Sequence, residues 1–237
     1  MKAYWLGQAG FLFVSEDGYT AMIDPYMSDS VEMAAGPSYK RMVPINTNFL
    51  IIPDTLIITH QHEDHMDFDT IDRVAFSSKK MTILASTNAA KKLRTRYGVN
   101  AEVFTFAPGT EFTNGPFHFC AVHAFHSDEA AIGVVIECDE KKVAHLGDTL
   151  FNHRLTSELP KDLDLLILPI NGKGDNMNAV DAARLTRIVY PKAVIPIHWD
   201  MFKDYGCDVK EYTDLFDKEA PIRIIPPVHY AEVDFNS

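Results

Sequence analysis

The chain has 237 residues, of which 46% are hydrophobic and 23% are charged, and its formal net charge is −11. This length and composition are typical of a globular protein with a sizeable core, which we expect to form one domain over residues 1–237, and they exclude long disordered tracts. The negative charge disfavours general attraction to nucleic acid or to an anionic membrane, and no run approaches the ~18 apolar residues of a membrane span.

The amino-terminal segment and the cysteines bear on the cellular compartment. The first ten residues contain no long apolar segment, so no signal peptide is expected. The three cysteines, Cys120, Cys138 and Cys207, are widely spaced and form no CxxC pair, which is typical of thiols in a reducing environment. We therefore expect a cytoplasmic protein. The sequence is compatible with a homo-oligomer.

Short apolar runs bounded by Gly, Pro, Asn or Asp predict β-strands along the whole chain. The predicted strands are Phe11–Val14, Tyr19–Ile23, Thr55–Thr59, Met81–Leu84, Ala101–Phe106, Phe117–Ala124, Ile132–Cys138, Lys142–Leu146, Leu165–Leu168, Ala193–Ile197 and Ile222–Ile225. Some, such as the run 165–168, are apolar throughout, as is typical of strands covered on both faces.

Three segments predict helices. They are a helix that begins after Asp67 as its N-cap, a helix from about Ser86 to Tyr97 that stops at Gly98, and a helix that begins near Asn178 and ends before Pro191. Many strands with few inserted helices predict an α/β fold of two packed sheets flanked by helices.

A histidine-rich motif directly follows the apolar run 56–59. Its residues are His60-Gln61-His62-Glu63-Asp64-His65. On an extended chain, positions two apart point the same way, so His60 and His62 can reach one cation, while a turn beyond them lets Asp64 and His65 reach a second. Composition alone predicts ~0.002 occurrences of HxHxDH in such a chain, so the motif favours a metal site over a solvated loop.

Further candidate ligands follow other predicted strands, where their side chains can meet the motif. Asp148 ends a strand and could bridge two cations, His198 follows the run 193–197, and His126 follows the run 117–124 with His123 as its rival. Imidazole and carboxylate ligands suit Zn²⁺ and also tolerate Mn²⁺. For the remaining histidines, packing or surface exposure is the favoured interpretation; these are His118, His145, His153 and His229.

The order HxHxDH, a later His, Gly-Asp and a late His resembles the ligand order of the metallo-β-lactamase superfamily. The likeness also covers the segment 5–11 and Ile23-Asp24-Pro25, whose Asp24 resembles the residue that orients a ligand histidine from the second shell. Segments 125–128, 147–149, 168–172, 175–178 and 196–200 resemble, more narrowly, the L-ascorbate-6-phosphate lactonase branch of metal-dependent hydrolases.

The resemblance implies an αββα sandwich of two mixed β-sheets with the site at the sheet edges. It implies one or two divalent metal ions, Zn²⁺ in most of the superfamily and Mn²⁺ in the lactonase branch, and it favours His126 over His123. The implied ligands are His60, His62, Asp64, His65, His126, Asp148 and His198.

The predicted function is hydrolysis by a metal-activated water, with Asp64 and Asp148 as catalytic residues that orient the water and accept its proton. The expected substrate is a small lactone or a phosphorylated sugar-type ester. Lys173 and Asn176 could grip a phosphate or sugar oxygen, and Trp199 could line the pocket, although an ordinary loop and ordinary packing explain these three residues as well.

Two alternatives remain open at this stage. A phosphodiesterase or nuclease of the same superfamily would also use paired metals, but the acidic balance and the lack of a basic arm argue against a nucleic-acid partner. The basic segments Lys40-Arg41 and Lys91–Arg96 are more typical of solvated faces. A non-catalytic metal-binding sensor is the second alternative, and the presence of Asp64 argues against it.

Overall fold

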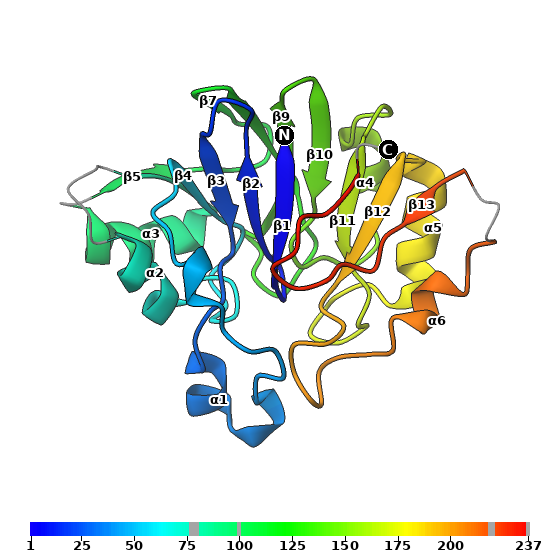
Figure 1. Cartoon of the computed structure of the whole chain (residues 1–237), viewed down its shortest axis with the longest axis horizontal. Helices are drawn as coiled ribbons and strands as arrows, with labels where there is room; N and C mark the ends of the chain where they lie inside the picture. Colours follow the sequence, from blue (N-terminus) through cyan, green and yellow to red (C-terminus); the bar gives the residue numbers. More distant parts are fainter. Residues whose placement is uncertain (76–80, 99–100, 218–220, 236–237) are drawn as a thin grey trace.

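The computed structural model describes residues 1–75, 81–98, 101–217 and 221–235. Two mixed β-sheets face each other, and helices cover the outer face of each sheet (Figure 1). This arrangement confirms the predicted αββα sandwich. Among the described residues, no helix is both long enough and apolar enough to cross a membrane.

The first sheet contains six strands in the order in which they occur along the chain. They are β1 (Lys2–Gly7), β2 (Gly10–Val14), β3 (Thr20–Ile23), β4 (Thr55–Ile58), β5 (Met81–Ala85) and β6 (Ala101–Thr105). Strands β1 to β3 pair antiparallel, and β3 to β6 pair parallel. The parallel strands are joined through α2 (Phe68–Ala75) and α3 (Thr87–Tyr97).

The second sheet contains seven strands and repeats this plan. They are β7 (Glu111–Asn114), β8 (Phe117–His123), β9 (Ile132–Cys138), β10 (Lys141–His145), β11 (Leu165–Pro169), β12 (Ala193–Ile197) and β13 (Arg223–Ile224). Strands β7 to β10 pair antiparallel, and β10 to β13 pair parallel through α4 (His153–Glu158), α5 (Ala179–Val189) and α6 (Lys210–Thr213). The two halves therefore share a topology, although no internal repeat is obvious in the sequence.

Alternating side chains of the buried strands divide the core into layers. Ile57 of β4 and Ile167 of β11 point between the sheets, where the largest apolar cluster lies. Leu56 packs on the opposite face against α2 and α3, and Leu166 packs against α5. Because both faces of these strands are covered, their sequences are apolar throughout, as expected for parallel strands under helices.

Every predicted strand is present with both ends within one residue of the prediction, and the three predicted helices are confirmed. The sequence analysis did not predict β1, β7, α4, α6, α1 (Ser30–Ala35) or the two 3₁₀ turns η1 (Pro37–Tyr39) and η2 (Thr47–Phe49). Strand β7 is a polar edge strand with no buried residue, so it carries little hydrophobic pattern. The missed helices are at most six residues long, too short for a clear helical period.

Candidate metal centre

The motif and the other candidate ligands meet at one edge of the sandwich, the lower edge in Figure 1. Strands β4, β10 and β12 end there, so the residues that follow them, His60, Asp148 and His198, reach a common place. His126 arrives from the loop after β8. Both sheets therefore contribute to one site, which explains why its residues are spread over most of the chain.

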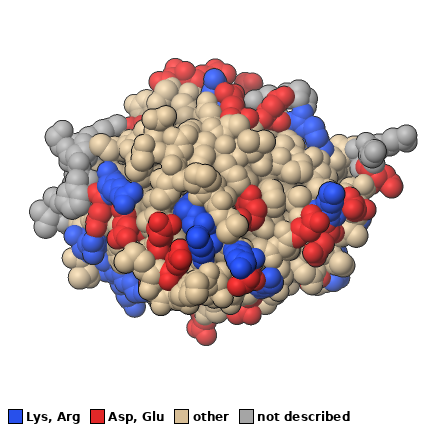
Figure 2. All heavy atoms as spheres, turned by 60° about the horizontal axis from the view of Figure 1, so that its bottom comes forward, with Lys and Arg blue, Asp and Glu red and all other residues tan. Residues whose placement is uncertain are grey.

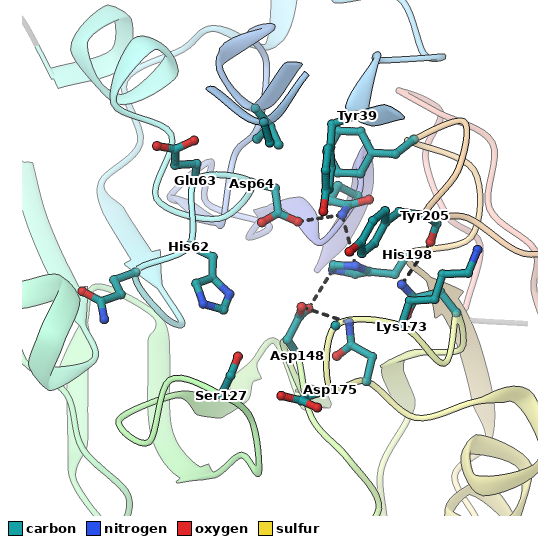
Figure 3. A pocket seen from close by; sticks show the side chains of 18 of the residues that line it. Tyr39, His62, Glu63, Asp64, Ser127, Asp148, Lys173, Asp175, His198 and Tyr205 are labelled. Carbon is teal, nitrogen blue, oxygen red and sulfur yellow. Dashed lines mark hydrogen bonds and ion pairs between the residues drawn. The ribbon is translucent and has the colours of Figure 1, made fainter. Parts of the chain in front are cut away.

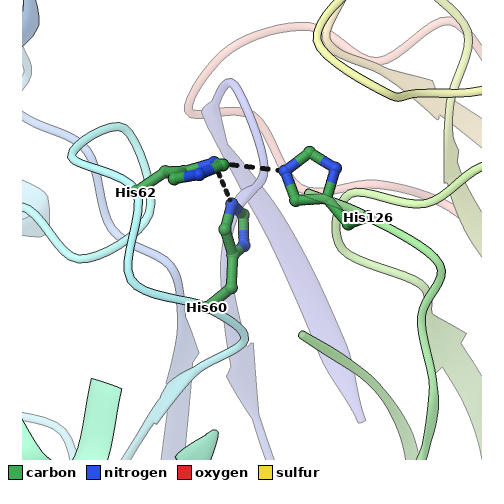
Figure 4. Close-up of side chains that lie close together, drawn as sticks. All are labelled: His60, His62 and His126. Atoms are coloured by element: carbon green, nitrogen blue, oxygen red, sulfur yellow. Dashed lines mark hydrogen bonds between the residues drawn. The ribbon is translucent and has the colours of Figure 1, made fainter. Parts of the chain in front are cut away.

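Three imidazoles form the first ligand group, His60, His62 and His126, whose ring nitrogens lie within 4.8 Å of one another. His62 Nδ1 lies 2.9 Å from His60 Nε2 and 3.1 Å from His126 Nε2 (Figure 4). One proton on His62 Nδ1 could bridge only one of these contacts at a time. A cation placed among the three nitrogens would satisfy all of them together.

The outer nitrogens of two of these rings already have partners. His126 Nδ1 lies 3.1 Å from the carbonyl oxygen of Asp175, to which it can donate. His60 Nδ1 lies 3.2 Å from Thr59 Oγ1, whose own proton goes to Asp24. Protons at these outer positions leave both Nε2 lone pairs facing inward. Such outer contacts are what orients histidine ligands in metal sites.

Burial also favours neutral rings in the first group. It holds the pKa of His60 well below the usual range and lowers that of His62, and the neighbouring histidines act in the same direction. Because a histidine must be neutral to bind a cation, both rings are in the binding form at neutral pH.

The second ligand group is Asp64, His65 and His198, whose ligand atoms also lie within 4.8 Å of one another. His65 Nε2 lies 3.6 Å from Asp64 Oδ2 and 3.2 Å from Asp148 Oδ1, and His198 Nε2 lies 2.7 Å from the same Asp148 oxygen. His65 Nε2, His198 Nε2 and Asp148 Oδ1 are nevertheless buried without a hydrogen-bond partner. Buried polar atoms that converge in this way fit a cation between them.

The electrostatics of the second group attract positive charge. Burial lowers the pKa of His65, but the carboxylates of Asp148, Asp64 and Asp24 outweigh burial and raise it well above the usual range. Burial alone would raise the pKa of Asp148. The neighbouring His198 and His65 outweigh burial and hold the pKa of Asp148 well below its usual range. The same negative potential that would hold a proton on His65 would hold a divalent cation in its place.

Asp148 faces both ligand groups. Its Oδ1 faces the second group, while its Oδ2 lies 3.9 Å from His126 Nε2 in the first. Asn176 donates to Oδ2 at 2.9 Å and accepts from Thr149 N at 3.0 Å, so its amide fixes the carboxylate. This placement suits the bridging role expected for Asp148.

Asp24 is fully buried behind His65. It accepts hydrogen bonds from the backbone and the hydroxyl of Thr59, and its Oδ2 lies 2.7 Å from His65 Nδ1. Although Asp24, His60 and His65 could themselves surround a cation, the carboxylate of Asp24 is already used by these contacts. The geometry thus suits the orienting role expected for Asp24.

The other histidines lie outside the two ligand groups. His123, the rival of His126, places Nδ1 2.8 Å from Glu158 Oε1 on α4. His145 is fully buried, where its Nε2 lies 2.8 Å from the carbonyl of Ala9 and burial lowers its pKa to about 4. His118 and His153 are on the surface, and His229 stacks on Trp5 at 4.0 Å.

A cavity of about 460 Å³ opens beside the ligands, and Asp64, Asp148 and His198 point into it (Figure 3). Its polar side is formed by the motif and by the loop 171–176. Its apolar side is formed by α1 and by an aromatic wall, which we define as Tyr39, Phe202 and Tyr205. A cavity of this volume is large enough for a small molecule.

The residues considered for substrate contact have other partners in this structure. Lys173 lines the cavity, but its ammonium donates to the carbonyls of Asp204 and Gly206 at 2.8 and 2.9 Å. Asn176 also lines it, with its amide engaged by Asp148 and Thr149. The structure does not bring Trp199 into the cavity lining; its ring stacks on Trp5 at 5.8 Å.

Some residues of the site escaped the sequence analysis. Gln8 reaches the second ligand group from the β1–β2 turn, Tyr39 ends the 3₁₀ turn η1, and Tyr205 lies in a turn after β12. Asp128 accepts from Gln61 N at 3.2 Å and from the Asn88 side chain at 2.7 Å, which anchors the motif loop. Gln8 and Asp128 lay inside segments that carried the family resemblance, which was the available signal, but their contacts depend on the tertiary fold.

The chain is similar to known proteins over most of its length. The family model for the β-lactamase superfamily domain matches residues 20–199. A relative named UPF0173 metal-dependent hydrolase, from Thermococcus onnurineus, is 27% identical over 240 residues, and the match covers 98% of this chain and 100% of the relative.

Solved structures share the fold over the whole chain. An isothiocyanate hydrolase from Delia radicum gut bacteria superposes with a TM-score of 0.78 and 20% identity, and the match covers 100% of both chains. A metallo hydrolase from the archaeon Ignicoccus hospitalis superposes with a TM-score of 0.73 and 20% identity over 98% of this chain and 97% of that one. At these identities the likeness establishes the fold.

Proposed function

Because the chain belongs to the family of β-lactamase superfamily domains, we propose that it is a metal-dependent hydrolase that cleaves a small ester. The first candidate substrate is an uncharged lactone. The observation that carries the proposal is the convergence of two ligand groups on Asp148 at the floor of a cavity. Relatives named metal-dependent hydrolases match nearly the whole chain, which supports the reaction class.

The residues present fit one or two divalent cations, Zn²⁺ or Mn²⁺. His60, His62 and His126 would hold one, Asp64, His65 and His198 the other, and Asp148 would contact both. When bound, the cations supply Lewis acidity, which polarises a carbonyl and lowers the pKa of a coordinated water to about 7. Four residues of this set line the cavity, and the Asp64 side chain is 20% exposed there; the four are His62, Asp64, Asp148 and His198.

The catalytic work of the chain itself falls to its carboxylates. Asp64 lies at the cavity surface, where it can orient the attacking water and accept its proton. Asp148 keeps its negative charge because its pKa is held low, so it can neutralise positive charge throughout the reaction.

Tyr39 is half-buried, and burial together with a hydrogen bond to Tyr205 raises its pKa to about 12. Its phenol therefore stays protonated and can donate to a substrate oxygen.

The cavity favours an uncharged substrate with a planar or apolar group. Apart from the candidate ligands Asp64 and Asp148, the charged residues in the lining are Glu63, Asp175, Lys92 and Lys173, whose charges sum to zero. Tyr39 and Tyr205 stack at 4.5 Å, and Phe202 meets the Tyr39 ring edge-on at 5.7 Å. This aromatic wall offers ring faces and edges to a substrate.

A phosphorylated sugar-type ester, which the lactonase resemblance suggests, is the second substrate candidate. A phosphate needs free N–H donors or cationic side chains. Of the two lysines in the lining, Lys173 already donates to two carbonyls, which leaves Lys92 of α3 as the lining cation that could meet a phosphate. We therefore rank the uncharged lactone first and keep the phosphorylated lactone as a direct competitor in the assay.

A polynucleotide substrate fits this surface poorly. On the face that Figure 2 shows, basic side chains are interspersed with acidic ones rather than gathered in a stripe. Binding to a nucleic-acid backbone depends on continuous positive potential, and the chain carries a net charge of −11. A non-catalytic sensor is disfavoured because Asp64, the residue proposed to activate water, is present and open to the cavity.

The test is a panel of initial hydrolysis rates on metal-stripped protein reconstituted separately with Mn²⁺ and Zn²⁺. The substrates are dihydrocoumarin, γ-butyrolactone, a phosphorylated sugar lactone, a chromogenic phosphodiester and benzyl isothiocyanate, the last because a structural neighbour is named an isothiocyanate hydrolase. We expect the aromatic lactone to have the highest kcat/KM. Preference for the phosphorylated lactone would reverse our ranking, and turnover of the diester alone would refute the substrate class.

A matched pair of variants tests the aromatic wall. Aromatic contacts contribute about 0.5–1.5 kcal/mol each, so Tyr39→Ala should raise KM for dihydrocoumarin by about 2- to 12-fold and leave KM for γ-butyrolactone nearly unchanged. Tyr39→Phe keeps the ring and should keep KM, with any loss falling on kcat. Equal losses on both lactones would show that the wall does not select the substrate.

A further inference from the structure

The β1–β2 turn places one buried side chain between the two sheets at the site. Gln8 is 3% exposed and comes from the amino-terminal end of the chain. Its Nε2 donates to Asp64 Oδ2 at 2.7 Å and lies 3.1 Å from His198 Nδ1. Asp64 follows β4 in the first sheet, and His198 follows β12 in the second. A single amide nitrogen thus contacts ligand residues from both sheets.

The backbone of this turn has an uncommon conformation at Gln8. Gln8 has a backbone φ of +51°. Residues other than glycine rarely adopt this left-handed conformation, which costs about 1 kcal/mol. The indole of Trp5 donates to the Gln8 carbonyl at 3.0 Å and holds the turn from inside the core. Glycine would adopt this conformation at lower cost, so the backbone of the turn does not explain why glutamine stands here. The contacts of the glutamine side chain explain it.

The chemistry of the amide matches the Asp64 carboxylate. A primary amide nitrogen carries N–H donors and an ionised carboxylate only accepts, so this contact is a hydrogen bond in one direction. A donor on Asp64 Oδ2 restrains the rotation of that carboxylate and directs Oδ1 away from Gln8. A neutral His198 that binds a cation through Nε2 carries its proton on Nδ1, so the 3.1 Å approach of Gln8 Nε2 to Nδ1 is a packing contact and not a hydrogen bond.

We propose that Gln8 is a positioning residue for the second ligand group, which holds the carboxylate of Asp64 in place and thereby sets the affinity for the second cation. The side-chain contacts of Gln8 go to the second ligand group, whereas the three imidazoles of the first group contact one another. This inference rests on the proposed metal centre but not on hydrolysis. Removal of the Gln8 amide therefore weakens the binding of one cation selectively.

The experiment measures stepwise Zn²⁺ binding to metal-stripped protein by competition with a chromophoric chelator, with bound zinc counted after dialysis. Gln8→Met keeps the length and flexibility of the side chain but removes both N–H donors. Loss of such an orienting contact weakens metal binding about 10- to 100-fold. We expect wild-type protein to bind two zinc ions, and Gln8→Met to bind the first within twofold of wild type and the second about 10- to 100-fold more weakly.

Two further variants separate positioning from folding. Gln8→Asn tolerates the left-handed backbone but is one methylene shorter, so it should share the defect of Gln8→Met. Thr186→Val removes a buried hydrogen bond between Thr186 and Tyr212, 2.7 Å long, outside the cavity lining. It should lower the urea midpoint of unfolding and leave both zinc steps unchanged.

The outcomes are decisive in either direction. The proposal is overturned if wild-type protein binds a single zinc, if Gln8→Met binds both ions as wild type does, or if it weakens both steps in proportion. A protein that binds two zinc ions with the expected Gln8 effect but hydrolyses no substrate would refute the proposed function and leave this inference standing.

Discussion

Replacement of Asp24 by asparagine tests how the centre is held in place. Asp24 is fully buried, has φ of +41°, and contacts Thr59 N at 2.8 Å and His65 Nδ1 at 2.7 Å. Asparagine has nearly the same size and tolerates positive φ, and its oxygen can still accept from Thr59 N. Its amide nitrogen, however, would face His65 Nδ1 with a donor where the ring requires an acceptor.

The magnitude follows from the loss of Oδ2 as an acceptor for His65 Nδ1 and for the Thr59 hydroxyl. The hydroxyl can rotate to accept from the new amide, so His65 Nδ1 is the donor left without a partner. A buried donor without a partner costs about 1–3 kcal/mol, so Asp24→Asn should lower the free energy of unfolding of the metal-free protein by about that amount. Loss of a partner that orients a ligand histidine weakens metal binding by about 10- to 100-fold, or about 1.4–2.8 kcal/mol. Asp24→Ala also leaves Thr59 without its acceptor and should cost about 3–5 kcal/mol in stability.

The assay combines urea unfolding in chelator with a zinc competition titration for wild type, Asp24→Asn and Asp24→Ala. We expect stability to fall in that order and zinc affinity to be already reduced in the asparagine variant. If Asp24→Asn keeps wild-type zinc affinity within twofold, the carboxylate does not orient His65 and our account of the second ligand group is wrong.

Three further predictions concern histidines and Asp148. His126→Ala should remove one bound metal, whereas His123→Ala should leave the metal content unchanged; equal metal loss in both would refute our choice of His126. The pKa of His145 is lowered to about 4 in the folded protein, whereas a histidine in the unfolded chain has a pKa near 6.5. The free energy of unfolding should therefore fall by roughly 3 kcal/mol as pH falls from about 6.5 to 4. His145→Gln should flatten that part of the stability–pH profile of the metal-free protein; an unchanged profile would contradict the buried neutral ring. Asp148→Asn should lower kcat by at least about 100-fold, measured with dihydrocoumarin, with a circular dichroism spectrum like that of wild type; full activity would exclude a catalytic role for Asp148.

Much of the fold could be predicted from local sequence because its central strands are covered on both faces. The run Leu165–Leu168 is apolar throughout, and turn residues bound it, so both its type and its ends were visible. Strand β1 was not predicted although Trp5 and Leu6 are buried in it. It is short and runs into Gly7, and its pairing with β2 is a tertiary property that no local pattern encodes.

The candidate ligands were predictable because the chemistry of metal binding restricts both residue type and place. His60 and His62 stand two apart after an apolar run, and Asp148 and His198 end other such runs. Gln8 and the aromatic wall were not predictable in the same way. Gln8 meets His198 across 190 positions of sequence, and only the packing of the two sheets brings them together.

The most direct test of the central claim is to titrate metal-stripped protein with Mn²⁺ or Zn²⁺ while bound metal and the hydrolysis rate are measured on the same sample. The account predicts no hydrolysis in the stripped protein and a rate that rises with bound metal until the ligand groups are filled. Hydrolysis that persists at full rate in the stripped protein would contradict a metal-dependent reaction at this site.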